Sequence, residues 1–256
     1  MKKSAFTLKV ENDLKKLSPK NYTGKFKPED YVKGNGHELS KLKFLNLKMP
    51  VVRNYLDSLD QDKKSSRSPQ HFKKMNQLWF ESDIFDAKII ALYWLDHQST
   101  DFLVKNQKQI FKWVHQIDNW AHSDAYCSAL ARIFEFDQKK ALPTYLKWNK
   151  HQNSWLRRCS MVATFYYSYQ RETQPSFELA KKLVSPHFKA KEYYVQKAVG
   201  WTLREMYNVY PEKTLYFIKR NNHHLSSIAW VAASEKLSAK TKRPLLEERK
   251  QLRKNK

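Results

Sequence analysis

Apolar residues recur every three to four positions along most of residues 83–237, as they do on the buried face of an amphipathic helix. Within residues 83–96, for example, Phe85, Ile89 and Leu92 share one face. The same pattern predicts helices over residues 102–117, 119–136, 139–148, 154–167, 177–184, 192–207, 211–219 and 225–237. No convincing strand-like alternation occurs, so the sequence predicts an all-α fold.

Capping residues and prolines suggest where these helices begin and end. Asp83 and Ser154 have side chains that can cap the helices after them. Pro175 and Pro211 fit the first turn of a helix, where a missing N–H does no harm. Pro186 is expected to mark a break between two helices.

The spacing of the helices predicts a repeat. Alternate helices begin near residues 83, 119, 154, 191 and 225, which are 34 to 37 positions apart. A two-helix unit of this length is typical of α-solenoids. The Trp-x-x-Leu-Gly pattern of TPR repeats is absent, so we expect a right-handed solenoid of HEAT-like helix pairs whose second helices line a concave binding face. An irregular helical bundle with accidental spacing is the alternative.

We expect residues 1–256 to form one such domain. Residues 1–36 are less regular, and residues 19–36 are rich in turn residues. Residues 60–69 are predicted to form an exposed loop. The strongly basic residues 239–256 are predicted to form a tail, as a frayed or exposed helix.

The composition narrows the range of functions. The chain has only four glycines, and Gly34-x-Gly36 has neither a third glycine nor a preceding strand, which excludes a phosphate loop and a dinucleotide fingerprint. A formal net charge of +23 indicates a polyanionic partner, with nucleic acid favoured over a membrane surface. No apolar run is long enough to span a membrane, and no secretory signal follows Met1.

The cysteines and histidines suggest neither a metal nor a cofactor. Cys127 and Cys159 are too few for an iron–sulfur cluster and cannot alone form a zinc site. Both lie in apolar-periodic stretches, so we expect buried free thiols in a reducing compartment, the cytoplasm.

An aromatic residue and a charged residue recur on three equivalent helices. Each pair is spaced by one helical turn, and such pairs can form a surface for the nucleic-acid backbone and its bases. The residues are Trp120 with Asp124, Trp155 with Arg158, and Trp201 with Lys197 and Arg204. The alternative is structural, since a helical Trp is often a core residue and a helical Asp is often solvated. Of the adjacent Arg157 and Arg158, one is expected to face solvent.

Four segments resemble the AlkD-type DNA alkylation repair family, the HEAT-like alkylpurine DNA glycosylases. The most specific is Gln196-Lys-Ala-Val-Gly-Trp-Thr-Leu-Arg-Glu205. Trp155-Leu-Arg-Arg158 and Asn119-Trp-Ala-His-Ser-Asp124 are similar to shorter family elements. Residues 44–53 are similar to a fourth, with Asn46 where the family has glycine. Ala121 and His122 also depart from the family, which often has an aromatic or acidic residue beside the Trp.

The resemblance implies a monofunctional glycosylase that hydrolyses the N-glycosidic bond of N3- or N7-alkylated purines in duplex DNA. It implies that Asp124, Trp120 and Trp201 are the catalytic residues and that Arg158 contacts the DNA backbone. Lys197, Arg204, Arg157 and Trp155 are further candidates for DNA binding. We expect a monomer, associated with the nucleoid, that needs no cofactor.

Two other functions remain open from the sequence. The same scaffold could bind branched or damaged DNA without excising a base, or it could be a solenoid that binds an acidic protein. Gly200 lies inside the most specific motif, where it costs a helix about 1 kcal/mol relative to Ala. It indicates close approach by a neighbouring helix or by DNA, or a simple packing role.

Overall fold

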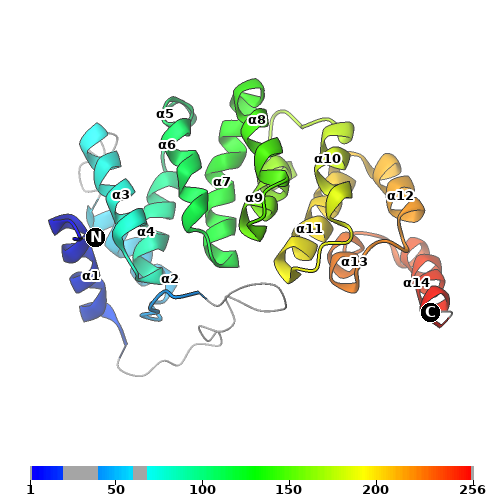
Figure 1. Ribbon diagram of the computed structural model, residues 1–256, viewed down its shortest axis with the longest axis horizontal. Helices are drawn as coiled ribbons and strands as arrows, with labels where there is room; N and C mark the ends of the chain where they lie inside the picture. The colour runs from blue at the N-terminus through cyan, green and yellow to red at the C-terminus, as the bar shows by residue number, and fades with distance from the viewer. Residues whose placement is uncertain (1, 20–39, 60–67, 255–256) are drawn as a thin grey trace. The chain divides into compact units, whose positions relative to one another are not determined.

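The computed structural model describes residues 2–19, 40–59 and 68–254, and these are almost entirely helical (Figure 1). Most of the turn-rich segment and of the loop predicted at residues 60–69 lies outside this part of the chain. Within it, the isolated parallel bridge between Lys43 and Ile84 is the one extended pairing. The helices are α1 (Ala5–Leu17), α2 (Met49–Leu59), α3 (Pro69–Glu81), α4 (Phe85–Asp96), α5 (Thr100–Lys105), α6 (Gln107–Ile110), α7 (Trp120–Phe136), α8 (Gln138–Asn149), α9 (Ser154–Phe165), α10 (Phe177–Val184), α11 (Tyr193–Val209), α12 (Pro211–Arg220), α13 (Ser227–Ala233) and α14 (Ala239–Lys254), with 3₁₀ turns η3 (Phe111–Gln116), η4 (Ser168–Gln170) and η5 (Ser185–His187).

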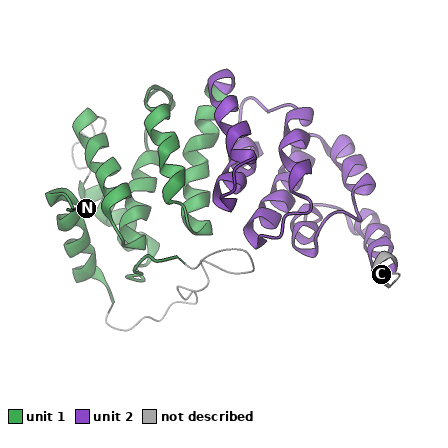
Figure 2. Cartoon of the chain, in the orientation of Figure 1, with its two compact units in different colours: residues 1–33, 38–136 green, residues 34–37, 137–256 purple. Residues whose placement is uncertain are grey.

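The helices form two compact units (Figure 2). Unit 1 comprises residues 1–33 and 38–136, and unit 2 comprises residues 34–37 and 137–256. In unit 1, α4 packs against α3, α2 and α7, and α5 packs against α7. In unit 2, α9 packs against α8, α10 and α11, while α11 also packs against α12 and α13. Helices α4, α7, α9, α11 and α13 begin 34 to 39 residues apart, which confirms the predicted two-helix repeat.

Two of the predicted helix caps are wrong. The residue before α4 is Ile84, whose apolar side chain cannot cap the helix. Asp83, the predicted cap, pairs instead with Lys3 and Lys43. Before α9, the Asn153 side chain accepts a hydrogen bond from the Trp155 backbone N–H at 2.8 Å. Asn153 still has an extended backbone, as a capping residue needs, whereas Ser154 is already helical.

Helix boundaries also differ from the prediction in two places. The single helix expected over residues 102–117 is divided into α5, α6 and η3, and the Asn106 side chain caps the Phe102 carbonyl at 2.8 Å where α5 ends. Pro175 precedes α10 rather than lying in its first turn, because Ser176 caps that helix. Pro211 does occupy the first turn of α12, and Pro186 lies in a break between α10 and α11, as predicted.

The basic C-terminus forms α14, and this helix is docked on unit 2 along one side. Leu245 and Arg249 are both buried. Arg249 donates to the Leu225 carbonyl at 2.8 Å, and its guanidinium lies 5.0 Å from the centre of the Trp230 ring. The predicted tail is therefore a helix with one face covered, and the Lys240, Arg243 and Lys250 side chains are exposed.

The interior glycine of α11 is explained by a neighbouring helix. A Cβ atom on Gly200 would lie 2.3 Å from the Ala229 carbonyl oxygen of α13 and 2.9 Å from the Ala229 Cα. Such contacts are far below van der Waals separation. Of the alternatives left by the sequence, close approach by a helix is the one observed.

The loop before α2 places Asn46 in the left-handed region, with φ of 57°. Asn tolerates this conformation better than most residues, and Gly tolerates it best. The buried Asp86 carboxylate accepts from the Leu45 and Leu47 backbone N–H groups, at 2.8 and 3.1 Å, and so holds the loop on either side. Asparagine at position 46 therefore meets a backbone requirement that glycine would also meet.

His122 is fully buried at the centre of unit 1. Its ring stacks on Phe85 at 4.5 Å, and Phe85 stacks on Phe44 at 4.7 Å. Nε2 donates to the Phe85 carbonyl at 3.2 Å, which leaves Nδ1 to accept from the Asn119 amide at 2.9 Å. Burial, with a smaller effect of Lys88, lowers the pKa of His122 to about 3.

Gly200→Ala is predicted to destabilise the protein by about 1–3 kcal/mol, although alanine is the better helix former. The clash with α13 is with backbone atoms, which cannot move aside as a flexible side chain can. Chemical unfolding of the two proteins measures the change. Lys197→Ala, at a partly exposed position on the same helix, is the control and should change stability by less than about 0.5 kcal/mol. Equal or greater stability of Gly200→Ala would contradict this packing.

Stability is predicted to fall as the pH drops from about 6.5 toward 4. An unfolded histidine takes up a proton near pH 6.5, whereas the folded state keeps His122 neutral down to a pKa of about 3, so acid favours unfolding. His122→Gln should reduce the slope of unfolding free energy against pH by about 1.4 kcal/mol per pH unit in this range. His187, whose pKa burial lowers to about 4, supplies a remaining slope. Identical slopes for wild type and variant would refute the role of His122.

Candidate nucleic-acid interface

One side of the first two turns of α7 is partly exposed. It presents Trp120 and Asp124, one turn apart, and beside them only the small residues Ala121 and Ala125. The opposite side of these turns is buried and includes His122. An indole and a carboxylate therefore lie on one accessible strip of the helix.

Buried polar contacts fix the start of α7. Asn119 is fully buried, and its side-chain oxygen accepts from the His122 backbone N–H at 2.9 Å. Its amide group donates to Asp118 at 2.9 Å and to the His122 ring at 2.9 Å. The backbone at Trp120 is therefore held in place by Asn119 before it and by His122 after it.

A second partly exposed strip runs along α11 in unit 2 and carries Lys197, Trp201 and Arg204. The Arg204 guanidinium lies 5.6 Å from the centre of the Trp201 ring. It also pairs with Glu205 at 3.1 Å and with Glu235 at 2.8 Å. Lys197 lies 5.9 Å from the Tyr193 ring. The charge of Arg204 is thus balanced by two carboxylates, and no such pair is seen for Lys197 in the described residues.

Trp155 and Arg158 on α9 are buried, with exposed fractions of 6% and 7%. The Trp155 ring stacks on Tyr194 at 5.2 Å. Arg158 donates to the Tyr194 carbonyl at 3.0 Å, and its guanidinium lies 5.9 Å from the Tyr194 ring. Both side chains therefore join α9 to the first turn of α11.

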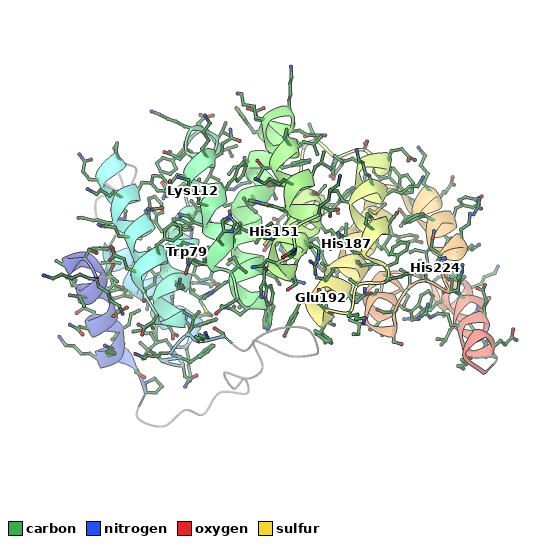
Figure 3. The ribbon with its side chains drawn as sticks, viewed as in Figure 1. Trp79, Lys112, His151, His187, Glu192 and His224 are labelled. Carbon is green, nitrogen blue, oxygen red and sulfur yellow. The ribbon has the colours of Figure 1, made fainter. Side chains whose placement is uncertain are left out.

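Whereas Arg158 is buried, Arg157 is partly exposed, with 14% of its side chain accessible. It donates to the carbonyl oxygens of His151 and Gln152, both at 2.7 Å, and to the Glu192 carboxylate. His151 and Glu192 are labelled in Figure 3. Arg157 thus links the loop before α9 to the residue before α11.

The tyrosines near Trp201 were not predicted from the sequence as site residues. Tyr166 and Tyr167 have ring centres 6.0 and 6.2 Å from that of Trp201, and Tyr169 lies 5.6 Å from Tyr167. Helix α9 had been predicted to continue to Tyr167, but it ends at Phe165. The occurrence of three tyrosines within four positions is the feature of the sequence that could have indicated this group of rings.

The candidate residues therefore divide between the two units. Unit 1 holds Trp120 and Asp124 on α7, and unit 2 holds the strip of α11. Within the described ranges, no three His, Cys, Asp or Glu side chains gather as ligands for a metal ion. No helix in the described part of the chain has the length and apolar character to cross a membrane.

Comparison with known proteins agrees with this helical architecture. Residues 19–237 match the family model described as DNA alkylation repair enzyme. A protein described as a predicted DNA alkylation repair enzyme from Enterococcus faecalis is similar in structure, with a TM-score of 0.64 and 14% identity over 93% of this chain and 98% of that one. AlkD2 from Streptococcus mutans gives a TM-score of 0.51 and 20% identity over 73% of this chain and 100% of that one. No curated protein matches the chain significantly.

The family match covers most of the chain and includes all four segments whose resemblance was noted in the sequence. The two solved structures share its all-helical repeat fold. This chain therefore belongs to the DNA alkylation repair enzyme family.

Proposed function

We propose that the protein is a monofunctional DNA glycosylase that hydrolyses the N-glycosidic bond of cationic N3- or N7-alkylated purines in duplex DNA. The observation that carries the proposal is that Trp120 and Asp124 lie one helical turn apart on the accessible strip of α7. Membership of the DNA alkylation repair enzyme family supports the class of substrate. Trp201 on α11 supplies the third catalytic residue.

The proposed chemistry depends on the leaving group. Alkylation at N3 or N7 puts a positive charge on the purine, so the bond from C1′ to nitrogen breaks without a general acid. The sugar then carries positive charge, as in an oxocarbenium ion, which the Asp124 carboxylate would stabilise. The base leaves as a neutral molecule with the electron pair of the broken bond. A water molecule oriented by Asp124 then adds through its oxygen to C1′, and the proton that it loses passes to the solvent. The indole faces of Trp120 and Trp201 add cation–π stabilisation as the charge develops.

DNA binding in this proposal rests on the excess of positive charge and on the strip of α11. A formal net charge of +23 favours binding to DNA through release of its condensed cations. Lys197 is the proposed phosphate contact on this strip. Trp155, Arg157 and Arg158, which the sequence also pointed to, are proposed to act on DNA binding indirectly, by holding the start of α11 in place.

The buried free thiols of Cys127 and Cys159 are consistent with a reducing compartment. We propose that the protein acts in the cytoplasm at the nucleoid, as a monomer.

Asp124→Asn is predicted to reduce the release of 7-methylguanine or 3-methyladenine from methylated duplex DNA by at least tenfold, because it removes the charge that stabilises the sugar cation. The measurement is single-turnover base release, with DNA binding recorded in parallel. Asp101→Asn, an exposed carboxylate on α5, is the matched control and should leave release unchanged. No release by the wild type under conditions in which it binds the DNA would reject the enzymatic function and leave a non-enzymatic DNA binder.

Lys197→Ala is predicted to weaken binding equally for all duplex sequences and to reduce the slope of log affinity against log salt by about one. Loss of one phosphate contact has this signature, whereas a local loss of stability does not. Lys219→Ala, which removes an exposed lysine of α12, controls for the change in net charge. An unchanged slope for Lys197→Ala, or equal slopes for the two variants, would exclude the proposed contact.

A further inference from the structure

The turn after α9 carries three tyrosines beside Trp201 that the proposed chemistry does not use. Tyr167 is 37% exposed and Tyr169 is 74% exposed. Tyr166 and Tyr167 both lie near Trp201, at 6.0 and 6.2 Å between ring centres. We call Tyr166, Tyr167, Tyr169 and Trp201 the aromatic cluster, and all of it belongs to unit 2.

The backbone at Tyr167 is strained. Its φ of 40° and ψ of 70° lie in the left-handed region, and no other described non-glycine residue besides Asn46 has a positive φ. A residue with a bulky side chain pays about 1–2 kcal/mol for this conformation. The strain persists only if the surrounding structure holds the turn in place.

Several hydrogen bonds do hold the turn. The Glu205 carboxylate, which is buried, accepts from the Ser168 backbone N–H at 3.2 Å and from the Ser168 hydroxyl at 2.8 Å. Gln174 donates to the Ser168 carbonyl at 2.7 Å. Arg171 donates to the Thr164 carbonyl and so caps the end of α9. Three side chains thus hold a strained turn in place while Tyr167 and Tyr169 stay exposed.

These hydrogen bonds distinguish the aromatic cluster from an ordinary exposed tyrosine. Single exposed apolar side chains are common and need no explanation. Tyr216 on α12 is such a case: it is 62% exposed, and its described partner is Arg220 at 3.1 Å. The aromatic cluster instead presents several rings around Trp201, with the Arg204 guanidinium beside that ring.

We infer that the aromatic cluster is a stacking surface for an unpaired nucleoside of the bound DNA. Every base has an aromatic face, so rings recognise an unstacked base whatever its sequence, whereas paired bases remain stacked within the duplex. Lys197, one turn before Trp201 on the same strip of α11, favours a ligand that carries phosphate. The inference rests on the proposed DNA binding and adds a preference for locally unpaired DNA.

The test compares two duplexes of equal length and charge, one fully paired and one with a single unpaired nucleoside. Binding is followed by fluorescence anisotropy at one salt concentration. Tyr167→Gly removes the ring and accepts the left-handed backbone without strain, so the fold is retained. The wild type should prefer the unpaired duplex, and Tyr167→Gly combined with Tyr169→Ala should reduce that preference at least fivefold.

Tyr167→Phe keeps the ring and should keep the preference, and Tyr216→Ala is the control for loss of an exposed tyrosine. If the double variant has less than wild-type thermal stability, Tyr169→Ala alone supplies the test, since Tyr169 is exposed. Binding by the wild type with an unchanged preference in the variants would overturn the stacking surface and leave the proposed function intact. Failure of the wild type to bind either duplex would overturn both.

Discussion

At Gly200 the backbone of α13 lies so close to α11 that any side chain would meet the Ala229 carbonyl oxygen at 2.3 Å. This close approach decides which side of α11 is buried. With Gly200 against α13, the adjacent Trp201 remains partly exposed, in line with Lys197 one turn before it. The orientation of the strip that is proposed to contact DNA therefore follows from the absence of one methyl group.

Unit 1 orients its own candidate residues in a different way. There the start of α7 is held by buried polar groups: Asn119 bonds both the backbone and the ring of His122, and that ring stacks on Phe85. Holding His122 inside leaves Trp120 and Asp124 on the opposite, accessible side. In both units a tightly constrained buried residue lies next to a partly exposed tryptophan. In each unit, therefore, the residue that fixes the helix is the sequence neighbour of a tryptophan that is proposed to act in catalysis.

The sequence predicted the helices and their repeat because burying one face of a helix imposes a period that can be read directly. It also singled out Gly200, since a glycine inside a helix needs a reason. Spacing shows that Trp155 and Arg158 share a face, but not that the face is buried against Tyr194. The strained turn at Tyr167 has no periodic signature, because it depends on a carboxylate, Glu205, that is distant in the chain.

In the proposed function, duplex DNA contacts the exposed strips of α7 and α11 and not helices α10 and α12, which also carry lysines and arginines. Hydroxyl-radical footprinting read by mass spectrometry tests it directly, because aromatic side chains are readily oxidised where they are exposed. Duplex DNA is expected to protect Trp120, Trp201 and Tyr167 from oxidation and to leave the oxidation of Tyr216 on α12 unchanged. Protection of Tyr216, with the other three unaffected, would contradict it.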